Sequence, residues 1–249
     1  MRARLLLLSA LLLVSLPGGA AAQNVRDDAR SAIRRGNELY ARAEYEAAIG
    51  EYAGVPREAG ELYARSLYNI GVCHYELWRT EEAVAFYREA AEALGGRYPK
   101  ALYALGVALE DLGRAAEARA SYERADAASR GRHAPALFRL GLLAARVGDH
   151  DAAASLFRRA VARSADQFPA GHNNLGVMLA LKGRLREAER EFERALRMSG
   201  GAFDVAARNL RLCRSLLAGG ATAQRASLEI VRDLAAPDRA AALDGEFSR

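Results

Sequence analysis

The sequence predicts an all-α fold, a right-handed α-solenoid in which helical hairpins stack one after another. Two observations lead to this prediction. A glycine recurs every 35 residues, and the apolar residues around each glycine follow the 3.6-residue period of a helix. Composition agrees, because 51% apolar residues, 27% charged residues and 6 prolines among 249 residues exclude a largely disordered chain.

The first 22 residues have the pattern of an export signal. Arg2 and Arg4 precede an apolar run over residues 5–16, and a Pro-Gly-Gly break then leads to Ala20 and Ala22. The apolar run is shorter than the ~20 residues that a membrane-spanning helix needs. We therefore expect cleavage after Ala22, no stable membrane span in the mature chain, and a periplasmic or secreted protein.

Five glycines set the register of residues 29–200. Alanine follows each glycine after 12 residues, an aromatic residue after 16 and a small apolar residue after 19. The glycine and the alanine let two helices approach closely, and the aromatic residue fills the space above them. A lone hairpin cannot bury such an apolar stripe, so the five units must stack. The glycines are Gly36, Gly71, Gly106, Gly141 and Gly176, and the aromatic residues are Tyr52, Tyr87, Tyr122, Phe157 and Phe192.

This pattern resembles the tetratricopeptide repeat, whose motif places Leu-Gly, Ala, aromatic residues and often Pro at these spacings. Residues 167–196 match it best. The period of 35 exceeds the family's usual ~34, which places the additional residue in the loop between units. The first unit is weak, because Arg35 stands at a leucine position and Pro56 ends the second helix early. The resemblance covers residues 29–200 and implies a solenoid that binds proteins.

Residues 201–219 continue the register as one first helix with no matching second helix. Leu210 and Arg211 stand at its Leu-Gly positions, and we expect this helix to cap the last repeat. In residues 220–249 the spacing of Leu228, Val231 and Leu234 predicts one more short helix. A flexible tail is expected after Pro237.

The sequence contains no constellation typical of an enzyme, a metal site or a nucleotide site. Cys73 and Cys213 share one repeat position four units apart, too far for a disulfide, and we interpret both as small core residues. An intermolecular or redox role is the alternative. No two of the four histidines have the spacing of a metal pair, and no phosphate loop or nucleophile elbow is present. We expect no cofactor. The histidines are His74, His133, His150 and His172.

The charge pattern does not indicate nucleic-acid binding. The formal charge is +5, and removal of Arg2 and Arg4 with the signal lowers it to +3. Basic residues are interleaved with acidic ones along the second helices, which is typical of a solvated helix face. The expected partner is a protein or a peptide.

Helical rotation places one set of first-helix residues opposite the buried stripe. In the resembled family this face lines the concave surface. Aromatic residues and valines would bury partner side chains there, asparagines would satisfy backbone groups, and arginines would bind carboxylates. A two-asparagine, multi-lysine carboxylate clamp, known in some relatives, is not reproduced here. The candidate groove residues are Arg65, Tyr68, Asn69, Val72, Tyr75, Lys100, Tyr103, Val107, Phe138, Arg139, Asn173, Asn174, Arg208 and Asn209.

Together these patterns predict a non-catalytic protein-interaction scaffold of the bacterial cell envelope. We expect it to hold an extended peptide or a helix of its partner in the concave groove. Two alternatives stay open. The chain could be a structural repeat protein that assembles into a homo-oligomer, or an accessory subunit of an envelope enzyme or assembly complex. The sequence does not name the partner.

Overall fold

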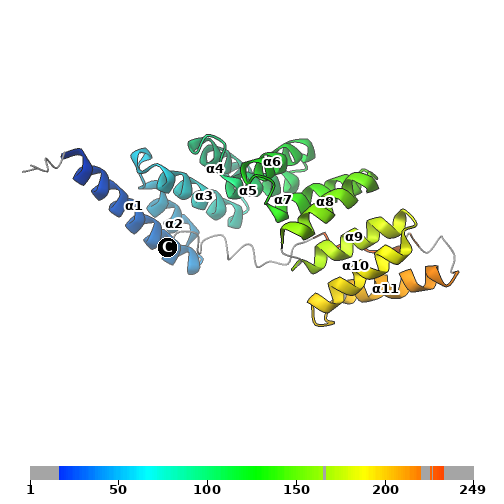
Figure 1. Ribbon diagram of the computed structural model, residues 1–249. Coiled ribbons are helices and arrows are strands. Elements are labelled where there is room, and N and C mark those ends of the chain that lie inside the picture. The colour runs from blue at the N-terminus through cyan, green and yellow to red at the C-terminus, as the bar shows by residue number, and fades with distance from the viewer. Residues whose placement is uncertain (1–16, 165–166, 220–224, 226, 233–249) are drawn as a thin grey trace, which may run out of the picture.

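The computed structural model describes residues 17–164, 167–219, 225 and 227–232. Within these residues the chain forms 11 α-helices, short 3-10 turns and no strand, arranged as a solenoid of hairpins (Figure 1). This confirms the predicted fold class. The first helices are α1 (Pro17–Ala41), α3 (Glu61–Glu76), α5 (Pro99–Asp111), α7 (Ala134–Arg146), α9 (Pro169–Leu181) and α11 (Asp204–Leu217). The second helices are α2 (Tyr45–Ala53), α4 (Thr80–Ala93), α6 (Ala115–Ala128), α8 (His150–Arg163) and α10 (Leu185–Met198).

The N-terminal helix α1 begins at Pro17 and therefore runs through Ala22, the predicted cleavage site. The apolar run 5–16 lies outside the described residues, so export and cleavage stay predictions. Among the residues that are described, no helix is both long and apolar enough to span a bilayer.

Each hairpin is closed by contact between its glycine and its aromatic residue. A Cβ atom added to Gly106 would lie 2.4 Å from Cε1 of Tyr122, and the other four units have the same close contact. The aromatic rings are fully or almost fully buried. Only a glycine leaves room for the ring at this distance, which explains why the register of 35 residues is kept from unit to unit.

Three-residue turns join the two helices of all five hairpins, with Ala43 at the second position of the first turn. The turn residue at the second position has a left-handed backbone, and in three of these hairpins it is Gly113, Gly148 or Gly183. The second hairpin has Trp78 there, at φ 60° and 88% exposed. The first hairpin is the irregular one, because α2 ends at Ala53 and Pro56 leads into the 3-10 turn Arg57–Ala59.

Aromatic trios pack the second to fourth hairpins against the units that follow. The first-helix ring in each trio contacts the second-helix ring of its own hairpin and a ring in the loop before the next unit. Their centroids are 5.0 to 5.7 Å apart. The trios are Tyr68–Tyr87–Tyr98, Tyr103–Tyr122–His133 and Phe138–Phe157–Phe168.

The trios correct one expectation from the sequence. Tyr68 and Phe138 were expected on the open floor of the groove, but both are buried where one hairpin meets the next. The physical reason is that a ring from the second helix of the same hairpin and a ring from the loop before the next unit enclose the side chain at this position. In the fifth unit the position is occupied by Asn173, and no ring is placed there.

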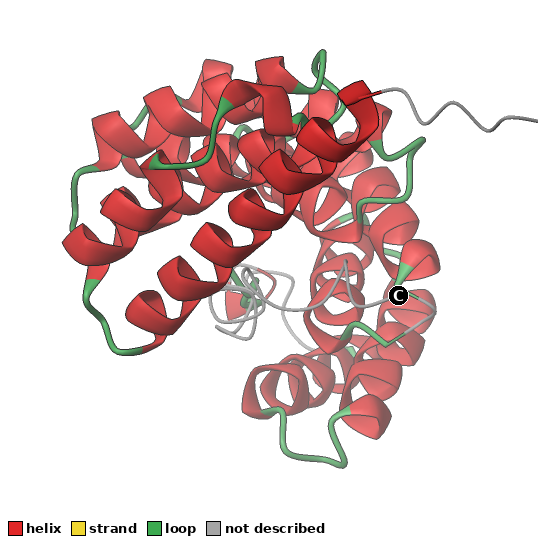
Figure 2. Ribbon diagram, turned by 90° about the vertical axis from the view of Figure 1, so that its left-hand side faces the viewer, coloured by secondary structure: helices red, strands yellow, loops and turns green. Residues whose placement is uncertain are grey.

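The predicted helix through Leu228, Val231 and Leu234 is wrong for the residues that are described. Residues 228–232 are not helical, and they lie inside the curve of the helices (Figure 2). Leu234 lies outside the described residues. A helix this short is marginal by itself, and β-branched Ile230 and Val231 favour an extended backbone. Asparagine side chains bind backbone groups that a helix would have paired internally, as described below.

Candidate peptide-binding groove

Residues 228–232 lie against α9 and α11 and are held through their main chain. The amide side chain of Asn209, on α11, binds both backbone groups of Glu229. Its Oδ1 accepts from the Glu229 N–H at 3.0 Å, and its Nδ2 donates to the Glu229 carbonyl at 2.8 Å. An amide side chain can pair with a peptide group in this way because it offers one acceptor and two donors.

Asn174, on α9, makes the same pair of contacts two residues further along. Its Oδ1 accepts from the Val231 N–H at 2.8 Å, and its Nδ2 donates to the Val231 carbonyl at 2.7 Å. Asn174 and Asn209 are 35 residues apart and thus occupy one position in two successive units. Residues i and i+2 of an extended chain present their backbone groups to the same edge. Asparagines at one position of successive repeats can therefore bind the backbone of every second residue.

Asn173 completes the polar cluster between the two helices. Its Oδ1 accepts from Asn209 at 2.9 Å, and its Nδ2 donates to Asn174 at 3.1 Å and to the Glu229 carbonyl at 3.1 Å. All three asparagines are at most 1% exposed. Because buried amides are costly unless paired, this network favours an occupied groove.

Side chains of the segment make further contacts on both sides of the main chain. Arg208 binds the carboxylate of Glu229 through two nitrogens, at 2.8 and 3.3 Å, and this arginine lowers the pKa of that carboxyl group. Leu228 and Ile230 pack against the apolar core formed by α7 to α11. We call the surface formed by Asn173, Asn174, Arg208 and Asn209 the asparagine groove.

These four residues are among the candidates that the sequence singles out, and the structure brings them together. The occupant is what sequence reasoning missed. The available signal was the pairing of Asn174 with Asn209 at one repeat position in adjacent units, together with the alternation of apolar and polar residues in Leu228-Glu229-Ile230.

The other ten candidates lie further towards the N-terminus, on α3, α5 and α7. Asn69 stands at the same repeat position as Asn174 but donates to Asn37 at 3.4 Å. Arg139 lies 3.7 Å from Glu110, and Tyr75 donates to Asp111. The remaining seven are buried or half-buried along α3, α5 and α7 or at their starts: Arg65, Tyr68, Val72, Lys100, Tyr103, Val107 and Phe138.

The cysteines are free and buried, as the repeat position predicts. Burial raises the pKa of the Cys73 thiol to about 12, with the Glu76 carboxylate adding to the effect. Burial likewise raises the pKa of the Cys213 thiol to about 11, and its Sγ donates to the Leu185 carbonyl at 3.3 Å. Neither thiol has the lowered pKa of a reactive cysteine.

The four histidines pack or form contacts within the repeats. His172 is buried and its Nδ1 lies 2.7 Å from Glu191, while His74 stacks on Phe86 and burial lowers its pKa. His133 caps α7 by accepting from the Ala136 N–H, and His150 is the first residue of α8. The described residues contain no cluster of His, Cys, Asp and Glu that could hold a metal ion.

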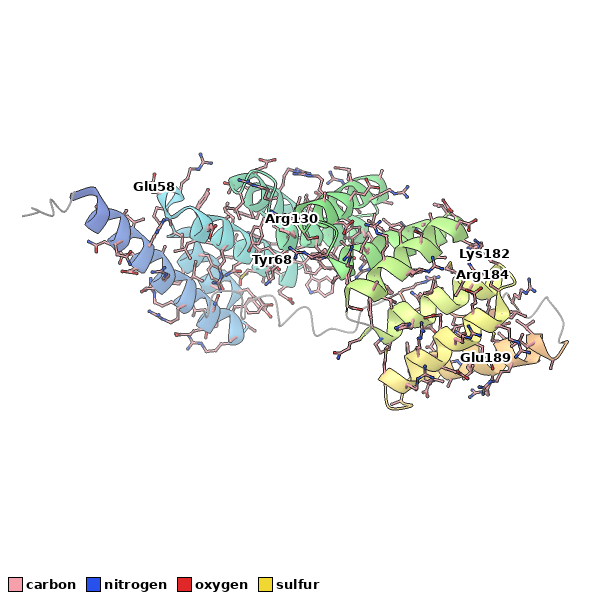
Figure 3. All side chains as sticks on the ribbon, viewed as in Figure 1. Glu58, Tyr68, Arg130, Lys182, Arg184 and Glu189 are labelled. Atoms are coloured by element: carbon pink, nitrogen blue, oxygen red, sulfur yellow. The ribbon has the colours of Figure 1, made fainter. Side chains whose placement is uncertain are left out.

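Several charges on α10 and α11 form ion pairs. Arg184, in the turn before α10, binds Glu187 of that helix, and Arg214 of α11 bridges Glu189 and Glu193 of α10 (Arg184 and Glu189 are labelled in Figure 3). Such pairs are exposed and contribute little to stability, about 0–1 kcal/mol each.

Comparison with protein-family models shows to which family the chain belongs. A tetratricopeptide repeat model matches residues 27–98 and 138–203, and a second one matches residues 99–131. The chain belongs to the tetratricopeptide repeat family. No curated protein matches this family member.

Solved tetratricopeptide structures share its fold. PilF of Pseudomonas aeruginosa is 17% identical, with a TM-score of 0.63 over 84% of this chain and 90% of the other. MamA is 22% identical, with a TM-score of 0.57 over 66% and 94% of the two chains. YrrB, described as having an unusual peptide-binding site, is 23% identical, with a TM-score of 0.52 over 75% and 94%. At these identities the likeness shows the fold alone.

Proposed function

We propose that the protein is a non-catalytic scaffold that binds an extended peptide segment of a partner protein in the asparagine groove. The observation that carries this proposal is the double pairing of Asn174 and Asn209 with the main chain of residues 229 and 231. Main-chain pairing of this kind depends little on the side chains of the bound segment, so a segment of another protein can make it equally well.

Burial and location of the groove support the proposal. The three asparagines lie on first helices, and the bound segment adds apolar contacts from Leu228 and Ile230 to the main-chain hydrogen bonds. An occupied site of this kind combines affinity from backbone pairing with selection by side chains. A peptide-binding site is also described for YrrB.

We further propose that the scaffold acts in the cell envelope of a bacterium. The pattern of residues 1–22 supports this location, with Arg2 and Arg4 before an apolar run and Ala20-x-Ala22 at its end. In this setting the scaffold would hold a partner in an envelope assembly.

Affinity capture with crosslinking from an envelope extract tests the function. Wild-type protein is compared with a variant that carries Asn174→Ala and Asn209→Ala, and with a control that carries Asn69→Ala at the same repeat position. We expect a partner whose crosslinked peptides map to α9 and α11, captured by wild type and control and lost with the double variant. Crosslinks that survive the double variant would contradict binding in the groove.

A further inference from the structure

We propose that residues 228–232 are a built-in competitor for the asparagine groove, and that the partner presents a segment of the same chemistry. That chemistry is an acidic residue between two apolar residues. This inference rests on the proposed function and adds to it the class of peptide and the way in which access is controlled.

The asparagines can bind only one chain at a time. Both polar atoms of the Asn174 side chain are engaged with Val231, and both polar atoms of Asn209 are engaged with Glu229. A partner segment must use the same four atoms to form the same pairing. Binding of the partner and binding of residues 228–232 are therefore mutually exclusive.

The competitor is tethered, which raises its local concentration. Helix α11 ends at Leu217, so only residues 218–227 separate it from the bound segment. A segment tethered through so few residues competes at an effective concentration on the order of millimolar. The partner can bind only those molecules in which the groove is open. Its apparent dissociation constant is therefore the intrinsic dissociation constant divided by the fraction of open molecules.

Side chains on the two sides of the bound segment determine which peptide sequences the groove accepts. Leu228 and Ile230 are two residues apart and both pack against the core formed by α7 to α11, so this side of the segment selects apolar residues. The intervening Glu229 forms its ion pair with Arg208. A lysine at that position would place like charges beside each other.

Fluorescence anisotropy with a labelled peptide tests the proposal in the full-length protein. The peptide has the sequence of residues 225–232, Arg-Ala-Ser-Leu-Glu-Ile-Val-Arg. The proteins are wild type, a released variant with Leu228→Asp and Ile230→Asp in the tail, and the released variant with Asn174→Ala and Asn209→Ala added. Circular dichroism establishes that all three have equal helicity.

We expect the released variant to bind the peptide at least about tenfold more tightly than wild type, because the competitor has been removed. Adding the two asparagine substitutions should abolish binding. Replacing glutamate by lysine in the peptide should weaken binding about fivefold, the scale of an exposed ion pair. Arg208→Glu in the released variant should restore the affinity for the lysine peptide and weaken it for the original.

The outcomes separate this inference from the proposed function. Equal peptide affinity for wild type and released variant would overturn the built-in competitor. Selection from a random peptide library on the released variant that depends on the asparagines but yields no acidic residue would overturn the peptide class while the proposed function stands. If no peptide at all binds through the asparagines, the proposed function fails too.

A second copy of the chain is the remaining occupant to distinguish. Light scattering on wild type should give a monomer whose mass does not depend on concentration. A wild-type dimer that is lost in the Glu229→Lys variant would show that residues 228–232 bind the groove of another copy. That result would overturn the proposal that these residues occupy the groove of their own chain.

Discussion

Asn174 pairs with Val231 in both directions, accepting from its N–H at 2.8 Å and donating to its carbonyl at 2.7 Å. The two residues are 57 positions apart in sequence, and the contact joins a helix of the fifth repeat to the chain after the capping helix. Asn209 makes the same contact with Glu229. The two asparagines therefore bind the N–H and carbonyl groups of alternate residues in an extended main chain.

Gly106→Ala should destabilise the fold by about 1–3 kcal/mol, the usual cost of overpacking a core. The new Cβ would lie 2.4 Å from the Tyr122 ring, which is fully buried and cannot move away. Urea denaturation measures the free energy of unfolding. Gly50→Ala is the matched control, because no atom lies within 4 Å of its Cβ position in α2.

The control should change stability in the opposite direction, by about 0.4–1 kcal/mol, because alanine has less backbone freedom in the unfolded chain. If Gly106→Ala proved as mild as Gly50→Ala, close contact between glycine and ring could not be what fixes the repeat.

Trp78→Gly should stabilise the protein by about 0.5–1 kcal/mol. Trp78 has φ 60° at a turn position where three other hairpins have glycine, and a left-handed backbone costs a non-glycine residue about 1–3 kcal/mol. Glycine removes that cost but gains freedom when unfolded, which offsets part of the benefit. The side chain is 88% exposed, so little burial is lost. Thermal unfolding measures the change. A lower unfolding midpoint for the variant than for the wild type would contradict backbone strain at Trp78.

Stability should fall as pH rises from about 9 towards about 12, in part through Cys73. Burial raises the pKa of this thiol from 9.0 to about 12, so the folded state holds the proton more tightly than the unfolded state does. Its contribution is fully present below pH 9 and is lost as the pH approaches the folded pKa. Denaturation at pH 8 and pH 10.5 gives the slope.

Cys73→Ala should make that slope shallower, although the variant will be less stable at pH 8, where the thiol is protonated in both states. An unchanged slope would mean that the thiol does not titrate differently in the two states. Alkylation gives an independent check, since both thiols should react only after unfolding.

The repeat architecture follows from the sequence because its contacts are local and recur. Gly106 and Tyr122 are 16 residues apart, and a glycine and an aromatic residue at this spacing recur in five units. One register of 35 residues therefore predicts every hairpin. The aromatic trios are less accessible to such reasoning. Whether Tyr68 faces solvent depends on how closely α3 approaches the following unit, and rotation of one helix cannot give that distance.

The candidate site was predictable in its asparagines and not in its occupant. Asn174 and Asn209 share one repeat position, and an amide there suits a peptide main chain. For residues 228–232, local spacing predicts a helix. Contacts with Asn174 and Asn209, 20 or more residues away in sequence, instead hold the chain extended. Propensity is a weak guide where tertiary hydrogen bonds compete with it.

Amide hydrogen exchange at residues 229–231 tests the central claim most directly. In wild type, the N–H groups of Glu229 and Val231 should exchange slowly. The Ile230 N–H should exchange faster, because neighbouring amides of an extended chain point to opposite edges. Asn174→Ala should remove two hydrogen bonds and lower the opening free energy at Val231 by about 1–3 kcal/mol, while Asn69→Ala should leave it unchanged. Exchange of all three amides at the rate of an unfolded chain in wild type would contradict the account.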